Sequence, residues 1–167
     1  TAGLPRVEEL FEARKPKGEA LVADIRGVVS ISEDKGQRII TIKSDKDEDV
    51  KFDYKIPYGV KLIVKDGDIV EAGDQLYAGS VNPQDILRTK GITGVQEFMI
   101  KEVQSAYRSN GVHINDKHIE VIVRQMLKKV KVNNPNDTDL LTNELVDRSK
   151  LEESNEKVLE EGGMPAT

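Results

Sequence analysis

The sequence predicts an α+β protein in which a small antiparallel β module is flanked by an N-terminal helix and a C-terminal helical section. Three patterns support this prediction. Apolar residues recur at helical spacing near the N-terminus, alternate with polar residues between about positions 19 and 79, and return to helical spacing after position 82. We therefore expect four segments, at residues 1–17, 18–80, 81–132 and 133–167.

The composition limits the possible classes of function. The 167 residues carry a net charge of -5 and include no cysteine, which excludes disulfide frameworks, thiolate metal sites and cysteine nucleophiles. The acidic balance argues against a free-standing nucleic-acid-binding domain, because such domains usually gain affinity from excess Lys and Arg. Any contact with DNA must therefore be local.

Two further features concern the place of the chain in a cell. No apolar run of about 18 residues and no signal-peptide pattern is present, so we expect no contact with a membrane. The first residue is Thr rather than Met. We therefore expect the chain to be an excerpt of a longer protein or a processed product.

Residues 3–15 are expected to form a helix that ends before Pro16, because proline cannot continue a helix. Its short apolar stripe consists of Val7, Leu10 and Phe11. Arg14 and Lys15 follow at the carbonyl end, where the helix dipole favours positive charge. From the residues alone, this is an ordinary amphipathic helix.

Six short segments rich in Val and Ile follow, separated by Gly-containing turns; they are residues 21–31, 38–43, 50–56, 62–64, 68–70 and 75–78. The run VKDGDIVEAGDQL, with its two Gly-Asp turns, resembles the barrel-sandwich hybrid of biotinyl and lipoyl carriers. A carrier would need a lysine at the tip of an exposed hairpin. The candidates Lys35 and Lys46 both lack the flanking residues typical of such carriers.

The β module has one acidic and one basic hairpin. Residues 44–49 contain four acids and one lysine, which would repel a phosphate backbone. Lys35 and Arg38, on the other hairpin, form the better DNA-facing edge. From the residues alone, however, such charges more often serve to discourage aggregation at a sheet edge.

The helical section should begin with a short helix at residues 84–90 that ends at Gly91. A longer helix should run from about position 93 to Gly111.

A third helix should begin at Asn115 or Asp116 and continue to Val132. Its apolar residues lie nearly all round the helix, so we expect it to be covered on most sides. Beyond it, residues 144–146 are expected to form a strand. Ser149 and Glu152 form the sequence pattern of a capping box for a last helix that ends at Glu161.

The two histidines do not form a metal site in this interpretation. His113 and His118 are five residues apart across a helix start, which does not place both rings on one helical face, and no acidic cluster completes a ligand set. Glu120 and Arg124 are four apart and can pair along the helix. We find no catalytic constellation and no candidate metal ligand.

Four strings resemble, in order, segments of the β′ (largest) subunit family of bacterial DNA-directed RNA polymerase: GLPRVEELFEARKPK, VNPQDILRTKG, EVQSAYRSNGV and NDKHIEVIVRQML. This resemblance covers essentially the whole chain. It implies a piece of that subunit that extends from the second helix of the trigger loop, at residues 1–17, through the jaw, at residues 18–80, towards a clamp region that is missing.

The resemblance also implies roles for residues. Gly3 would be the hinge of a mobile gate, and its packing face would consist of Val7, Leu10 and Phe11. The residues expected to contact downstream duplex DNA are Lys35, Arg38, Arg14 and Lys15. Such contacts would be sequence-independent and sensitive to salt.

The resemblance further implies that the intact enzyme would be a cytoplasmic, nucleoid-associated nucleotidyltransferase that uses two Mg²⁺ ions. Its metal-binding aspartates have no counterpart here, so we expect no cofactor in this fragment. The implied partners are the β, α and ω subunits, the remainder of β′, a sigma factor and downstream duplex DNA. Composition alone favours instead an acidic protein-interaction module, and this alternative stays open beside the carrier domain.

Overall fold

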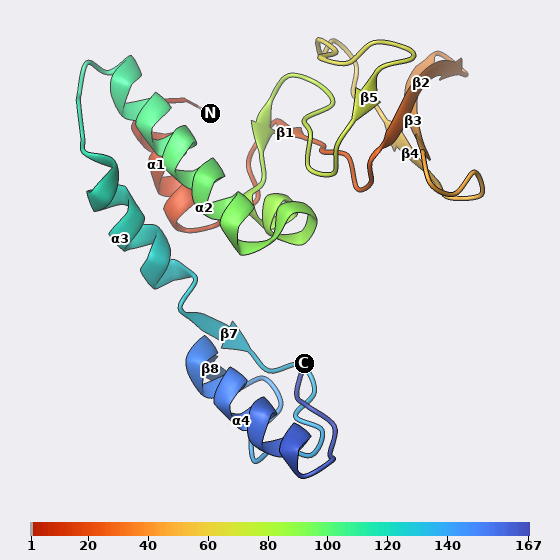
Figure 1. Ribbon diagram of the computed structural model, residues 1–167. Helices are drawn as coiled ribbons and strands as arrows, with labels where there is room; N and C mark the ends of the chain where they lie inside the picture. Colours follow the sequence, from red (N-terminus) through yellow and green to blue (C-terminus); the bar gives the residue numbers. More distant parts are fainter. Residues whose placement is uncertain (1) are drawn as a thin grey trace. The chain divides into compact units, whose positions relative to one another are not determined.

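The computed structural model describes residues 2–167, which form two compact units (Figure 1). Unit 1 extends to Asp116, and unit 2 begins at Lys117. The predicted α+β class with an antiparallel β module is confirmed. Among the described residues, no helix is both long and apolar enough to cross a membrane.

Helix α1, Leu4–Phe11, opens unit 1 and is shorter than the predicted helix. The helix ends because Ala13 adopts a left-handed backbone conformation, with a φ of 51°, and its N–H bonds to the carbonyl of Leu10. The predicted apolar stripe is largely correct. Val7 and Leu10 are buried, whereas Phe11 is half-buried.

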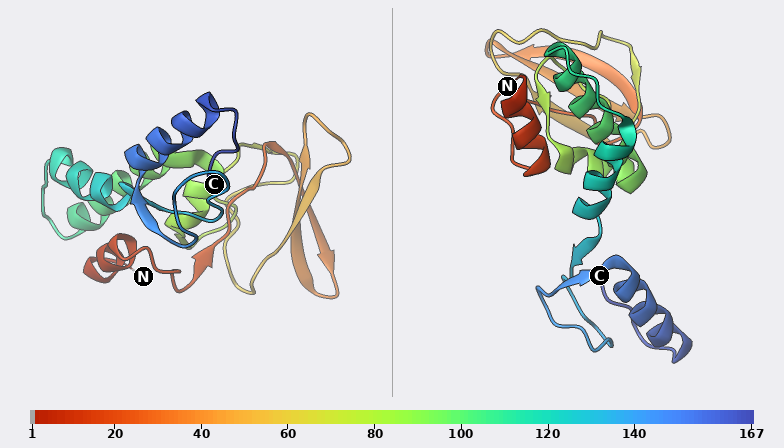
Figure 2. Two further views of the ribbon diagram at one scale, coloured as in Figure 1. Left: turned by 90° about the horizontal axis from the view of Figure 1, so that it is seen from below. Right: turned by 90° about the vertical axis from the view of Figure 1, so that its left-hand side faces the viewer.

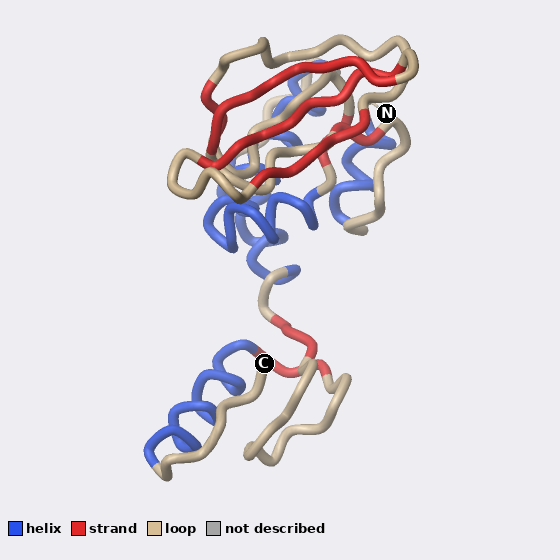
Figure 3. Tube along the Cα trace, turned by 90° about the vertical axis from the view of Figure 1, so that its right-hand side faces the viewer, coloured by secondary structure: helices blue, strands red, loops and turns tan. Residues whose placement is uncertain are grey.

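Unit 1 contains a curled four-stranded antiparallel sheet (Figure 3). It contains β2 (Gly27–Asp34), β3 (Gln37–Ser44), β4 (Lys51–Lys55) and β5 (Ile69–Val70), in the order β4-β3-β2-β5. The inner face carries the core, because opposed pairs such as Val29–Ile42 and Ile40–Tyr54 are buried. This is the alternation expected of a sheet with one covered face.

A second, very short sheet closes the module and was not predicted. β1 (Glu19–Ala20) pairs in parallel with β6 (Ser80–Val81). Two-residue strands are too short for alternation to indicate them. The expected strands at 62–64 and 75–78 are reduced to isolated bridges, Val22–Gln75 and Leu62–Tyr77.

Helix α2, Pro83–Ser109, packs against α1 (Figure 1). Asn82 caps it, since its side chain accepts a hydrogen bond from the Gln84 N–H at 3.0 Å. The helical run is interrupted at Gly91, whose φ of 73° and ψ of -167° lie outside the helical region. The predicted break between a short and a long helix is therefore correct.

Helix α3, Asp116–Met126, ends earlier than predicted. Residues 129–131 form instead strand β7 (Lys129–Lys131), which pairs antiparallel with β8 (Leu145–Asp147). The prediction that the helix is covered on most sides is also wrong, because Val121 and Ile122 are exposed in the structure.

Unit 2 has a small core of its own, made by Val132, Leu140, Val146 and Ala166. Helix α4, Arg148–Glu160, follows β8 directly and is the blue helix of Figure 2. Its N-cap is Asp147, without a side-chain capping bond, so the predicted capping box of Ser149 and Glu152 does not form.

Candidate nucleic-acid interface and hinge

Lys35 lies at the tip of the β2–β3 hairpin. Lys35 and Gly36 both have positive φ, 50° and 80°, which is the backbone geometry of a tight two-residue hairpin turn. The hydroxyl of Tyr58 donates a hydrogen bond to the Gly36 carbonyl at 3.0 Å and so braces the turn. The Lys35 side chain is exposed and has no polar partner among residues 2–167. It is therefore available to an external anion.

Arg38 lies on the same hairpin, but the sheet uses its guanidinium. Nη2 donates a hydrogen bond to the Val60 carbonyl at 3.0 Å, and the residue is only partly exposed. Arg38 shares strand parity with Ile40 and Ile42, which are both buried, so its side chain belongs to the inner face. Arg38 therefore links β3 to the segment that follows β4.

Arg14 and Lys15 follow α1, and each has an acidic partner. Arg14 pairs with Glu12, while the Lys15 Nζ lies 3.5 Å from a carboxylate oxygen of Glu19. The structure thus places Lys35 and Arg38 on one hairpin and these two residues on another part of unit 1. Only Lys35, of the four expected DNA contacts, is left without an internal partner.

The outer face of the same sheet carries three lysines that the sequence reasoning missed. Lys43 and Lys51 are directly opposite each other on β3 and β4, and Lys55 is opposite Ile39. All three are exposed and have no ion pair among the described residues. Because Ile40 and Ile42 face inward, the alternation along β3 could have assigned Lys43 to the outer face.

Gly3 precedes α1 and has a φ of 70°, a conformation that glycine adopts without strain. Its carbonyl accepts the N–H groups of Arg6 and Val7, at 3.0 and 3.3 Å. The chain therefore turns at Gly3 immediately before a fixed helix.

The anchor of that helix is Arg6, a buried residue that the sequence analysis did not single out. Its Nη1 lies 2.7 Å from Glu9 Oε1, and its Nη2 donates to the Val81 carbonyl at 2.9 Å. Nη2 also lies 3.5 Å from a carboxylate oxygen of Glu102 in α2. Arg6 is only 4% exposed, so these partners compensate the desolvation of its charge. They join α1 to β6 and α2.

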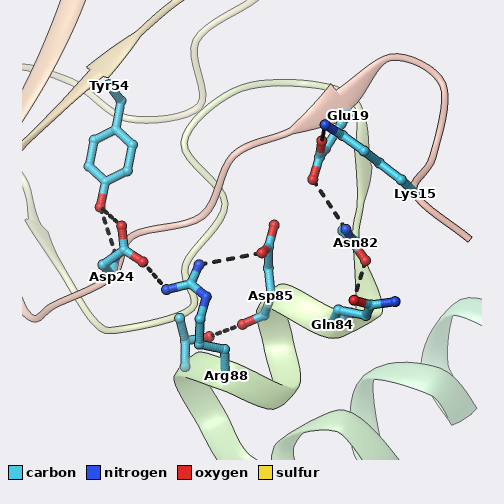
Figure 4. Close-up of polar contacts among 9 residues, drawn as sticks. Lys15, Glu19, Asp24, Tyr54, Asn82, Gln84, Asp85 and Arg88 are labelled. Atoms are coloured by element: carbon cyan, nitrogen blue, oxygen red, sulfur yellow. Dashed lines mark hydrogen bonds and ion pairs between the residues drawn. The ribbon is translucent and has the colours of Figure 1, made fainter. Parts of the chain in front are cut away.

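A second polar cluster joins the sheet to α2 (Figure 4). The Tyr54 hydroxyl donates to Asp24 Oδ2 at 2.6 Å and accepts the Asp24 N–H at 2.9 Å. Arg88 pairs with the same carboxylate and lies 3.4 Å from Asp85. Burial acts to raise the pKa of Asp24, but the hydrogen bonds from Tyr54 and Arg88 outweigh it and hold that pKa below 3.8. Burial and Asp24 together raise the pKa of Tyr54.

No candidate metal centre or catalytic group emerges from residues 2–167. Within that range, the structure brings together no three His, Asp or Glu side chains that could hold a metal ion. His113 and His118 are both exposed. Glu120 and Arg124 form no ion pair in the described part of the chain, although their spacing allows one.

Comparison with known proteins adds the decisive observation. Residues 6–156 match the family model described as RNA polymerase Rpb1, domain 5. The chain belongs to this family. It is 59% identical over 166 residues, 99% of the chain, to the DNA-directed RNA polymerase subunit beta' of Symbiobacterium thermophilum. It is 57% identical over its whole length to the subunit of Caldanaerobacter subterraneus, and 58% identical over 99% of the chain to that of Acetivibrio thermocellus. This Rpb1 domain 5 chain spans 14% of the length of each of these relatives.

Proposed function

We propose that this chain acts as part of the β′ subunit of a DNA-directed RNA polymerase and assists transcription without performing its chemistry. The observation that carries this proposal is the 59% identity, over nearly the whole chain, to a polymerase subunit beta'. In this proposal the enzyme transfers nucleotides with Mg²⁺ ions bound elsewhere in the subunit. The partners are the remainder of β′, the β, α and ω subunits and a sigma factor.

The sheet of unit 1 serves in this proposal as the jaw that contacts downstream duplex DNA. Lys35 at the hairpin tip and the outward-facing lysines of β3 and β4 supply the positive charge, which the chain as a whole lacks. Lys43 and Lys51 are directly opposite each other, and like charges so placed repel each other. Asp53, between Lys51 and Lys55 on the same face of β4, accepts a hydrogen bond from Thr41. The contacts of these lysines with DNA reach phosphates and carry no base specificity. Arg38 supports the hairpin through its bond to the Val60 carbonyl, whereas Arg14 and Lys15, paired with Glu12 and Glu19, lie outside this surface.

Gly3 serves as the hinge of the mobile trigger loop. Because Arg6 fixes α1 to β6 and α2, α1 is the static side of this hinge. Val7, Leu10 and Phe11 form the packing face of that helix. This differs from a helix that swings as a whole, which would have to break a buried ion pair at each movement.

The test of the DNA contact is a crosslinking experiment in polymerase reconstituted with full-length β′. A photoreactive residue replaces Lys35 in one enzyme and Lys46 in a matched control. Both positions lie in turns of the same sheet, but Lys46 stands among four acids. We expect crosslinks to the downstream duplex from position 35 and few from position 46. Equal yields from both positions, or none from position 35, would contradict the proposed interface.

The carrier-domain alternative gains no support. The family model covers the entire β module, and the relatives named above are polymerase subunits. Lys35 does stand at an exposed hairpin tip, as a carrier lysine would, but its neighbours remain Asp34 and Gly36. The acidic-module alternative likewise has no comparison in its favour.

A further inference from the structure

Unit 2 contains a pocket of about 500 Å³ where the second half of α3 meets the start of α4. Its lining residues are Val121, Arg124, Gln125, Lys128, Arg148, Ser149 and Glu152. All of them belong to unit 2. The pocket is thus formed by a single compact part of the chain.

The charge of this pocket is opposite to that of the chain. Three cations, Arg124, Lys128 and Arg148, face one carboxylate, Glu152, in a protein whose net charge is -5. Arg124 and Lys128 are exposed, and neither side chain has a polar partner among the described residues. Arg124 lies in the last turn of α3, and Lys128 follows two residues after the helix ends, so both cations border the same pocket.

Arg148 gives the pocket a fixed wall. Its Nη2 donates to the Leu127 carbonyl at 2.6 Å, and its backbone N–H donates to the Lys128 carbonyl at 2.9 Å. These bonds hold the first residue of α4 against the end of α3. One guanidinium is therefore positioned before any ligand arrives, which lowers the entropic cost of binding.

We propose that this pocket binds a phosphate group. Two guanidinium groups and one ammonium against a single carboxylate leave a net local charge that suits a doubly charged oxyanion. The planar donor arrangement of arginine matches phosphate oxygens in bidentate fashion. The phosphate could belong to a free polyphosphate or to a nucleic-acid backbone, since both present the same oxygens to these donors.

The test is a titration of the isotope-labelled 167-residue chain with inorganic pyrophosphate, followed through the arginine side-chain and α3 backbone resonances. The pocket variant is Arg124→Gln. The matched control is Lys157→Gln, which removes one exposed positive charge from α4 outside the pocket. We expect saturable shifts at Arg124 and Lys128, about tenfold weaker binding in Arg124→Gln, and unchanged binding in the control.

Parallel titrations with duplex DNA and with acetate identify the ligand. Tighter binding of DNA at the same resonances assigns the phosphate to nucleic acid, whereas saturation by pyrophosphate alone assigns it to a free phosphate compound. Either outcome supports a phosphate site. Equal saturation by acetate, equal weakening in both variants, or no shift with any phosphate would overturn the proposal.

Discussion

Two basic residues, Arg6 in α1 and Lys35 at the tip of the β2–β3 hairpin, lie in opposite environments. Arg6 is 4% exposed and contacts its own helix, β6 and α2. Lys35 is exposed and has no partner within residues 2–167. A buried charge must be compensated internally, whereas an exposed lysine contributes little to stability and remains open to an external anion. Arg6 therefore stabilises the fold, whereas Lys35 is a candidate for a functional contact.

Arg38 shows that proximity to a functional candidate does not make a residue functional. It lies three positions from Lys35, yet its guanidinium is bonded to the Val60 carbonyl on the inner side of the sheet. Lys35 lies in the exposed turn, whereas Arg38 lies in β3 with its side chain on the inner face. Internal bonding therefore distinguishes the two kinds of basic residue in this chain.

Among the variants that test this comparison, Arg6→Ala should cause the largest loss of unfolding free energy. It leaves the carboxylate of Glu9, a residue that is 9% exposed, without its cation. Breaking a buried pair of this kind costs about 3 kcal/mol of unfolding free energy. We expect hydrogen exchange to quicken throughout α1 and circular dichroism to report earlier unfolding in urea.

Arg14→Ala is the control for that variant, because Arg14 is an exposed basic residue of the same segment. Its pair with Glu12 should contribute less than about 1 kcal/mol. Similar losses in Arg6→Ala and Arg14→Ala would show that the anchor of α1 has been assigned to the wrong residue.

Tyr54→Phe should have the second largest effect, since it removes both hydrogen bonds between the phenol and Asp24. The expected loss of unfolding free energy is about 1.5 kcal/mol. The variant should also raise the pKa of Asp24, because the hydrogen bond from Tyr54 helps to keep that pKa low. Urea unfolding and an NMR titration of the Asp24 carboxyl measure the two effects.

The sign of the pH dependence follows from the lowered pKa of Asp24. A carboxyl whose folded pKa lies below 3.8 adds stability that is present above pH 3.8 and is lost as the pH falls through the folded value. This acid-dependent loss should be smaller in Tyr54→Phe than in the unchanged chain. An identical pH profile for both would contradict the assigned role of Tyr54.

Much of the fold could be predicted because it follows from local patterns. The β2–β3 hairpin, the break at Gly91 and the last helix all carry turn or periodicity patterns of their own. The predicted extension of α3 was wrong because Val130 and Val132 continue its apolar pattern. Tertiary contacts decide there for a strand, and Val132 enters the core of unit 2.

The candidate site could be predicted only in part. Lys35 was identifiable from its turn, and Lys43 could have been identified from strand alternation. The role of Arg6 could not, because its contacts with Val81 and Glu102 join residues far apart in the sequence. The basic pocket of unit 2 also depends on such contacts, since α3 and α4 contribute cations that lie more than twenty positions apart.

The substitution expected to affect stability least, Lys35→Ala, tests the proposed DNA contact most directly. Lys35→Ala should leave unfolding unchanged, yet in reconstituted polymerase it should shorten the lifetime of promoter complexes without altering nucleotide selection. The difference from the unchanged enzyme should be largest at low salt and shrink as salt is raised, because the variant has lost one phosphate contact. Lys46→Ala, in the acidic turn of the same sheet, is the control and should leave that lifetime unchanged. A normal lifetime in Lys35→Ala, or altered misincorporation with a normal lifetime, would contradict the proposed DNA contact of this hairpin.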